Sequence, residues 1–138
     1  MILVDTNVWS ELTRPRGDHA VLAWLEAHDD DLMLSTLVLA EIHHGIELAT
    51  SAPKRQALAA WRAGLEARYW GQTLAFGRES AREYGRIAAR PEVKVRQPQI
   101  IDMQIAAQAI EHGIALATRN AKDFDWIGID LIDPWQAR

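Results

Sequence analysis

Short apolar runs alternate along this chain with longer stretches in which apolar residues recur every three or four positions. Runs of the first kind predict strands, and stretches of the second kind predict amphipathic helices. The predicted strands are, in chain order, residues 1–4, 32–34, 73–76, 114–117 and 129–132. Strands that alternate with helices indicate an α/β fold with a central, mainly parallel sheet.

The predicted helices have recognisable ends. Asp18 is a good N-cap, Pro53 opens a helix, and Gly113 is a helix stop. The helices run over 8–12, from Asp18 to the break at 29–31, from Ser35 or Thr36 to 48, from 53 to Gly71, over 79–89 and over 99–112. Residues 91–98, which begin and end with proline, are expected to form a loop, and residues 120–124 a short turn or helix.

Length and composition narrow the class of protein. A chain of 138 residues fits one domain over 1–138, and without cysteine it has no disulfides. It shows no leader peptide and no apolar run near the roughly 20 residues of a membrane span, so we expect a soluble cytoplasmic protein. The net charge of -4 argues against a nonspecific nucleic-acid coat, although a nuclease with acidic metal ligands remains compatible with it. Of the six tryptophans, we expect Trp9, Trp24, Trp61 and Trp70 to pack in the core or at a subunit interface.

Four acidic residues stand where strand or helix ends would direct them toward one crevice. Asp5 directly follows the first predicted strand, and Asp123 lies shortly after the fourth. Glu41 lies in the helix after the second strand, and Asp102 in the first turn of an apolar helix. Ligands of open α/β sheets bind at the carboxyl ends of the strands, so these carboxylates are candidates for a shared site.

Each acid also has a simpler interpretation. Glu41 follows the apolar Leu37 and Val38 by four and three positions, and it could lie at the edge of a buried stripe with its carboxylate in water. Asp102 could compensate the helix dipole, and Thr6 and Asn7 could cap a helix. The set is more informative than its members, because hard oxygen ligands without cysteine or paired histidine favour Mg²⁺ or Mn²⁺.

A site of this kind suits phosphodiester hydrolysis. One ion lowers the pKa of a water for in-line attack, and a second, if present, stabilises the leaving oxygen. Thr6, Asn7, Thr118 and Asn120 are then candidates for orienting the ligands. Lys94, Arg96 and Arg119 are candidates for phosphate contacts, because they precede the Asp102 helix or follow a strand end.

Several motifs together resemble the PIN-domain family, in its VapC/FitB-type toxin branch. They span nearly the whole chain in order: Asp5-Thr6-Asn7-Val8, residues 39–42, residues 100–107, residues 112–124, and the tail with Gly128, Leu131-Ile132 and Pro134-Trp135. The resemblance implies a three-layer α/β/α domain with a central, mainly parallel sheet.

The same resemblance implies a function. It implies a Mg²⁺- or Mn²⁺-dependent endoribonuclease that acts as the toxin of a type II toxin–antitoxin pair, forms a homodimer and is blocked by a small antitoxin. The corresponding metal-site acids are Asp5, Glu41 and Asp102, with Asn120 or Asp123 at the fourth position. Some relatives carry Asp where this chain has the neutral Asn120, so Asp123 is a candidate for the missing charge.

Other classes remain as alternatives. The chain could be a DNA-directed nuclease, or a PIN-like module that binds RNA or protein without catalysis. Glu41 and His44 have the spacing of a di-iron motif, but a di-iron bundle needs two such motifs and the chain has one. Arg82, Arg86 and Arg90 follow helical spacing and are expected on a solvated face, and Arg14 and Arg16 offer a further phosphate contact on a loop.

Overall fold

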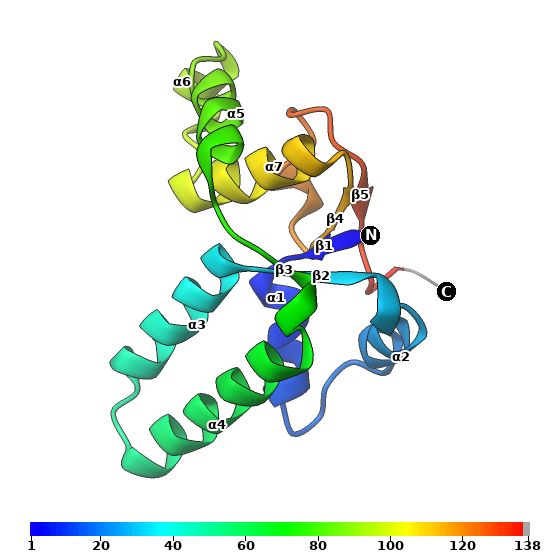
Figure 1. Cartoon of the computed structure of the whole chain (residues 1–138), viewed down its shortest axis with the longest axis vertical. Coiled ribbons are helices and arrows are strands. Elements are labelled where there is room, and N and C mark those ends of the chain that lie inside the picture. The colour runs from blue at the N-terminus through cyan, green and yellow to red at the C-terminus, as the bar shows by residue number, and fades with distance from the viewer. Residues whose placement is uncertain (137–138) are drawn as a thin grey trace.

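Strand β1, Ile2–Val4, lies at the centre of a parallel sheet (Figure 1). The computed structural model describes residues 1–136. Within them the sheet has five strands in the order β3-β2-β1-β4-β5, all paired in parallel. The other strands are β2 at Leu32–Ser35, β3 at Thr73–Leu74, β4 at Ala115–Ala117 and β5 at Leu131–Ile132. The predicted α/β fold with a parallel sheet is confirmed. Strand β2 is one residue longer than predicted, and the other four strands are one or two residues shorter.

Helices cover both faces of this sheet, and each face has its own apolar core. Successive residues of a strand point to opposite faces. Val4 and Leu34 therefore pack with the helices on one face, whereas Leu3 and Met33 pack with those on the other. The helices are α1 at Thr6–Trp9, α2 at His19–Ala27, α3 at Thr36–Leu48, α4 at Ala52–Arg68, α5 at Arg78–Ala88, α6 at Glu92–Arg96 and α7 at Ile100–His112.

The predicted helix caps form as the sequence indicates. The Asp18 carboxylate accepts hydrogen bonds from the backbone N–H groups of Ala20 and Val21 at the start of α2. The Ser35 hydroxyl accepts from the N–H of Leu37 and starts α3 directly after β2. Gly113 ends α7 with φ of 61°, a left-handed conformation that glycine adopts without steric cost. These caps fix where the helices that carry Glu41 and Asp102 begin and end.

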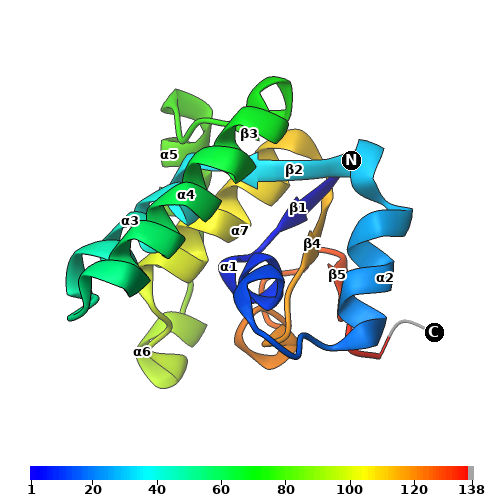
Figure 2. The same cartoon turned by 90° about the horizontal axis from the view of Figure 1, so that it is seen from below.

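Helices α3 and α4 pack side by side and extend away from the sheet as a long hairpin, which Figures 1 and 2 show from two directions. On the opposite face, α5 packs closely against α7. No helix of the described part of the chain is both long and apolar enough to cross a bilayer. The hairpin and the α5–α7 pair thus lie to either side of the carboxyl ends of the strands.

One prediction for the fold is wrong. Residues 91–98, expected to be a loop, contain the short helix α6, Glu92–Arg96. Val93 packs against the second apolar core, and the chain leaves α6 through Gln97 with φ of 47°. A helix of five residues is too short to show a hydrophobic period, so tertiary contacts rather than a sequence pattern define it.

The tryptophans divide between the core and the surface. Trp9 is fully buried and packs against Tyr69, with ring centroids 4.9 Å apart. Trp24 is also buried, and Trp61 is partly buried against the same core. Trp70 is 74% exposed, so it does not pack in the core of this chain, and its expected place at a subunit interface stays a prediction.

Candidate active site

The carboxyl edge of the sheet carries a cavity of about 320 Å³. Its walls include all four acids singled out from the sequence: Asp5, Glu41, Asp102 and Asp123. Thr6, Asn7, Ser10, Gln99 and Asn120 complete the lining. Residues from the first and last thirds of the chain meet here because β1 and β4 are neighbours in the sheet.

Asp5 is the most enclosed of the acids, with 6% of its surface exposed. Its Oδ1 accepts a hydrogen bond of 2.8 Å from the backbone N–H of Thr6, because Asp5 caps α1. Its Oδ2 accepts from the Thr118 hydroxyl at 2.8 Å and from the Asn7 amide at 3.3 Å. The carboxylate is therefore held in one orientation by donors from two segments of the chain.

Glu41 is held by the residue that follows Asp5. The Thr6 hydroxyl donates to Glu41 Oε1 at 2.7 Å, across 35 residues of sequence. This contact ties α3 to the end of β1. Thr6 thus serves both acids, the first through its backbone N–H and the second through its side chain.

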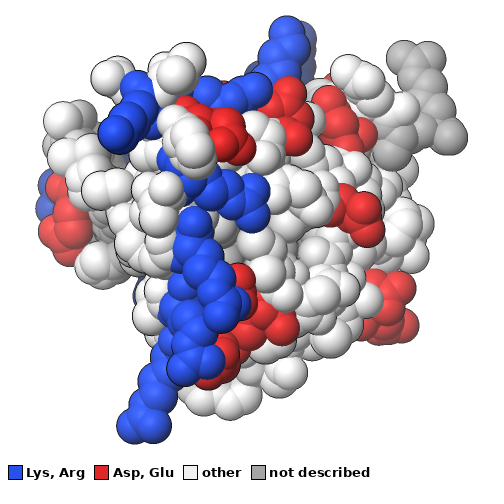
Figure 3. All heavy atoms as spheres, turned by 90° about the horizontal axis from the view of Figure 1, so that it is seen from above, with Lys and Arg blue, Asp and Glu red and all other residues white. Residues whose placement is uncertain are grey.

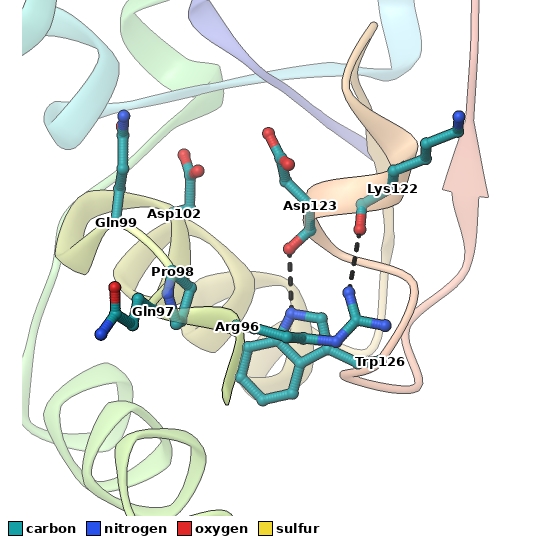
Figure 4. A pocket seen from close by; sticks show the side chains of 8 residues that line it. All are labelled: Arg96, Gln97, Pro98, Gln99, Asp102, Lys122, Asp123 and Trp126. Atoms are coloured by element: carbon teal, nitrogen blue, oxygen red, sulfur yellow. Dashed lines mark hydrogen bonds between the residues drawn. The ribbon is translucent and has the colours of Figure 1, made fainter. Parts of the chain in front are cut away.

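Asp102 and Asp123 approach the cavity from the other side. Asp102 lies in the first turn of α7, and Asp123 lies at the end of the 3-10 turn Ala121–Asp123. Figure 4 shows both carboxylates pointing to the same side, away from Trp126. Asn120 and Asp123 line the same cavity, so the geometry admits either of them as the fourth polar group.

The pKa values of Asp5, Glu41 and Asp102 are raised. Burial is the main cause of the raised pKa of Asp5, and the nearby Asp123 carboxylate adds to it. Burial likewise raises the pKa of Glu41, with a contribution from Asp5. The pKa of Asp102 rises from the ordinary 3.8 to about 6, first through burial and then through the charges of Asp5, Asp123 and Glu41. The cavity therefore concentrates negative charge that a cation would stabilise.

The ligand atoms available in this cavity suit a hard divalent cation, because they are carboxylate, amide and hydroxyl oxygens. Within residues 1–136, however, no three His, Asp or Glu side chains converge closely enough to form a ready ligand group. The acids line one cavity without forming a closed cage, and repulsion between like charges favours such a separation. Common coordination of one ion requires their side chains to close around it.

The predicted supporting residues form a connected network. The Thr118 side chain is fully buried and accepts from the backbone N–H of Asn120 at 3.2 Å. Asn7 donates to the Thr118 hydroxyl at 3.3 Å and accepts from the backbone N–H of Arg119 at 3.1 Å. The network joins the residues after β1 to those after β4 and so fixes the shape of the crevice.

Two of the three basic residues predicted to contact phosphate, Arg96 and Arg119, line cavities that share residues with the acid cavity and have partners within the protein. Arg119 lies over the Trp135 ring, 5.0 Å from its centroid. Arg96 forms an ion pair with Asp125 at 3.2 Å. Lys94 is exposed on α6 and does not line the acid cavity.

Other charged residues mainly form local pairs. Arg82 and Arg86 pair with Glu79 and Glu83 on α5. On the face shown in Figure 3, Lys and Arg atoms likewise lie beside Asp and Glu atoms rather than forming an uninterrupted basic surface.

Two further candidates from the sequence are engaged elsewhere. Arg14 pairs at 3.1 Å with Glu11, a buried carboxylate. His44 is exposed and does not line the acid cavity, although Glu41 does. The spacing of Glu41 and His44 therefore does not bring them to one site.

Sequence reasoning missed Ser10 and Gln99 as cavity residues. Ser10 lies four residues after Thr6, and Gln99 lies three residues before Asp102. Residues three or four apart share one face of a helix. The spacing of Ser10 from Thr6 and of Gln99 from Asp102 could therefore have predicted that they line the same cavity.

Comparisons with known proteins identify the family of this chain. The PIN domain family matches residues 2–128. The VapC ribonuclease Y4jK of Sinorhizobium fredii is 36% identical, with 99% of each chain covered. The toxin FitB of Neisseria gonorrhoeae is 31% identical, with 98% of this chain and 99% of FitB covered.

Solved structures give the same result. The crystal structure of FitAcB from Neisseria gonorrhoeae superposes with a TM-score of 0.88 at 30% identity, covering 99% of this chain and 100% of the matched chain. A structure of FitAB bound to a DNA fragment superposes with a TM-score of 0.87 at 31% identity, covering 100% of this chain and 98% of the matched chain. With its parallel sheet, its acid-lined crevice and this match over residues 2–128, the chain belongs to the PIN domain family.

Proposed function

We propose that this protein is a Mg²⁺- or Mn²⁺-dependent endoribonuclease that acts in the cytoplasm as the toxin of a toxin–antitoxin pair. The observation that carries the proposal is the cavity lined by Asp5, Glu41, Asp102 and Asp123 at the carboxyl edge of the sheet. It occurs in a chain that is 36% identical, over nearly its full length, to a protein named as a ribonuclease.

In this proposal the four carboxylates hold the cation, with Asp123 supplying the charge that Asn120 lacks. A bound ion of this type supplies positive charge to the phosphate oxygens and lowers the pKa of water. Thr118 and Asn7 orient the Asp5 carboxylate, and Thr6 orients Glu41. Donors that fix a ligand's orientation in this way typically change metal affinity or activity by about 10- to 100-fold when removed.

Lys94, Arg96 and Arg119 are proposed to contact the RNA backbone on either side of the crevice. Arg119 is the best placed of the three, because its backbone N–H donates to Asn7 and because it lines a cavity that shares Asn120 and Asp123 with the acid cavity. Contacts of this kind position a nucleic acid without reading its sequence.

The proposed protein partners are a cognate antitoxin and a second copy of this chain. Support for the antitoxin comes from the similar structures of FitAcB and FitAB, since FitB is named a toxin. The second copy of this chain rests on the family resemblance. An antitoxin that covers the acids would block access of RNA to them.

The test is cleavage of cellular RNA and of matched RNA and DNA oligonucleotides by the purified chain, with Mn²⁺ or with chelator. The proposal predicts RNA cleavage that needs the metal and that Asp5→Asn abolishes. The control Asp130→Asn changes an exposed acid that does not line the acid cavity, and it should cleave normally. Preferential cleavage of DNA, or undiminished cleavage by Asp5→Asn, would contradict the proposal.

A further inference from the structure

A second cavity, of about 250 Å³, opens directly beside the acid cavity (Figure 4). The two share Gln99, Asp102 and Asp123 in their walls. An RNA strand with one phosphate over the acids therefore has its adjacent nucleotide at the mouth of this second cavity.

Contacts within the protein preform this cavity. One wall is the turn between α6 and α7, and the other is the segment that follows β4. The Trp126 indole Nε1 donates to the backbone carbonyl of Asp123 at 3.0 Å, which fixes its ring. Arg96 joins the two walls, donating to the backbone carbonyl of Lys122 at 3.3 Å and pairing with Asp125.

The lining combines flat apolar surface with amide groups. Pro98 and Trp126 supply the apolar part, and Gln97 and Gln99 carry amide donors and acceptors at its edge. In Figure 4 the Gln97 amide points away from Trp126, so it has to turn toward a base that binds here. Both glutamines are exposed to solvent at the cavity. Proteins recognise unpaired bases of single-stranded RNA through stacking and through hydrogen bonds to the base edges, and this lining offers both.

Size and charge favour a base over a phosphate or a larger ligand. The volume lies below the range of about 300–1,000 Å³ that is usual for drug-sized ligands. Asp102 and Asp123 on the shared wall would repel a phosphate inside this cavity, where no cation is proposed to offset their charge. Figure 4 shows the Lys122 side chain extending away from Arg96, so its ammonium group does not offset those acids inside the cavity.

We propose that this cavity is a base-recognition subsite for the nucleotide next to the cleaved phosphate of single-stranded RNA. The amides of Gln97 and Gln99 read the edge of the base, and Pro98 and Trp126 form the apolar surface against which it packs. The inference rests on the proposed ribonuclease function and gives that site a sequence preference.

The first test is the cleavage pattern on a pool of random single-stranded RNA. The expected pattern has a base preference at one position adjoining the cut. Gln97→Gly combined with Gln99→Ala should reduce that preference by about tenfold and leave more distant positions unchanged. Glycine is chosen because position 97 has φ of 47°. Gln56→Ala, at an exposed position on α4, is the matched control and should keep the pattern.

The second test does not depend on turnover. In the Asp5→Asn protein, the indole NMR signal of Trp126, assigned with Trp126→Phe, should shift on titration with at least one of four single-base RNA tetranucleotides. The signal of the exposed Trp70 should not shift.

The outcomes separate the two proposals. An unmoved Trp126 signal, or a cleavage preference that survives the double substitution, overturns the subsite even if RNA is cleaved. A shifted Trp126 signal without metal-dependent cleavage supports the subsite and overturns the ribonuclease function.

Discussion

The Thr118 hydroxyl donates a 2.8 Å hydrogen bond to Oδ2 of Asp5, although 113 residues separate the two in sequence. This bond joins the ends of β1 and β4, whose pairing places both residues at the same edge of the sheet. It lowers the pKa of Asp5 and so opposes the effect of burial, which raises that pKa. The bond thus helps keep the most enclosed acid of the cavity ionised.

Replacing Thr118 tests this relationship. Thr118→Val removes a fully buried hydroxyl that bonds to Asp5, Asn7 and Asn120, and should cost about 1–3 kcal/mol of stability. Activity and Mn²⁺ affinity should fall about 10- to 100-fold, because Asp5 loses its orienting donor. Thr118→Ser keeps the hydroxyl and should retain most activity. Stability is measured by urea unfolding, Mn²⁺ affinity by titration and activity by RNA cleavage. Equal losses of activity and affinity in the Thr118→Val and Thr118→Ser variants would contradict a role for the hydroxyl.

The raised pKa of Asp102 predicts a pH dependence of stability in metal-free buffer. Since this pKa rises from 3.8 to about 6, the folded state favours the protonated carboxyl. The resulting stabilisation is fully present below pH 4 and is lost as the pH rises through about 6. The free energy of unfolding of the wild type should therefore fall between pH 4 and 7.

The control for this effect is a neutral substitution. Asp102→Asn cannot lose a proton, so its stability should fall less over the same interval, with Asp5 and Glu41 causing what decline remains. Asp130→Asn should follow the wild type. An unchanged slope in Asp102→Asn, measured by urea unfolding in chelator, would show that Asp102 does not cause the decline.

A close backbone approach at Gly17 predicts opposite effects of two glycine substitutions. A Cβ at Gly17 would lie 2.7 Å from the carbonyl oxygen of Glu11, in the connection that leads to α2. Gly17→Ala should therefore destabilise the protein by about 1–3 kcal/mol. Gly64 lies within α4 with open space around it, so Gly64→Ala should stabilise by about 0.4–1 kcal/mol. Thermal unfolding of the two variants checks the signs, and similar melting temperatures would contradict the prediction.

The sequence predicted the sheet and the positions of the acids because these follow from local patterns. Asp5 directly follows an apolar run. If that run is a buried strand of a parallel sheet, Asp5 must lie at the carboxyl edge of the sheet. The cap at Asp18 and the stop at Gly113 are also local signals, and both helix ends formed as predicted.

The remaining features depend on contacts between distant segments. Helix α6 is held by Val93 against the core and by Arg96 against the segment after β4, and neither contact leaves a periodic pattern. For the same reason the cavity beside Trp126 was not predicted, since its walls come from segments about 25 residues apart. Residue type alone did not predict burial at Trp70, because this aromatic residue lies in a helical pattern and is nevertheless exposed.

The central claim is that Asp5, Glu41, Asp102 and Asp123 jointly bind a divalent cation. The most direct test is an anomalous difference map from crystals of the protein soaked in Mn²⁺. The account predicts a peak in the acid cavity, within coordination distance of carboxylate oxygens from Asp5 and at least one other of these acids. Strong peaks only outside the cavity, with none beside Asp5, would contradict it.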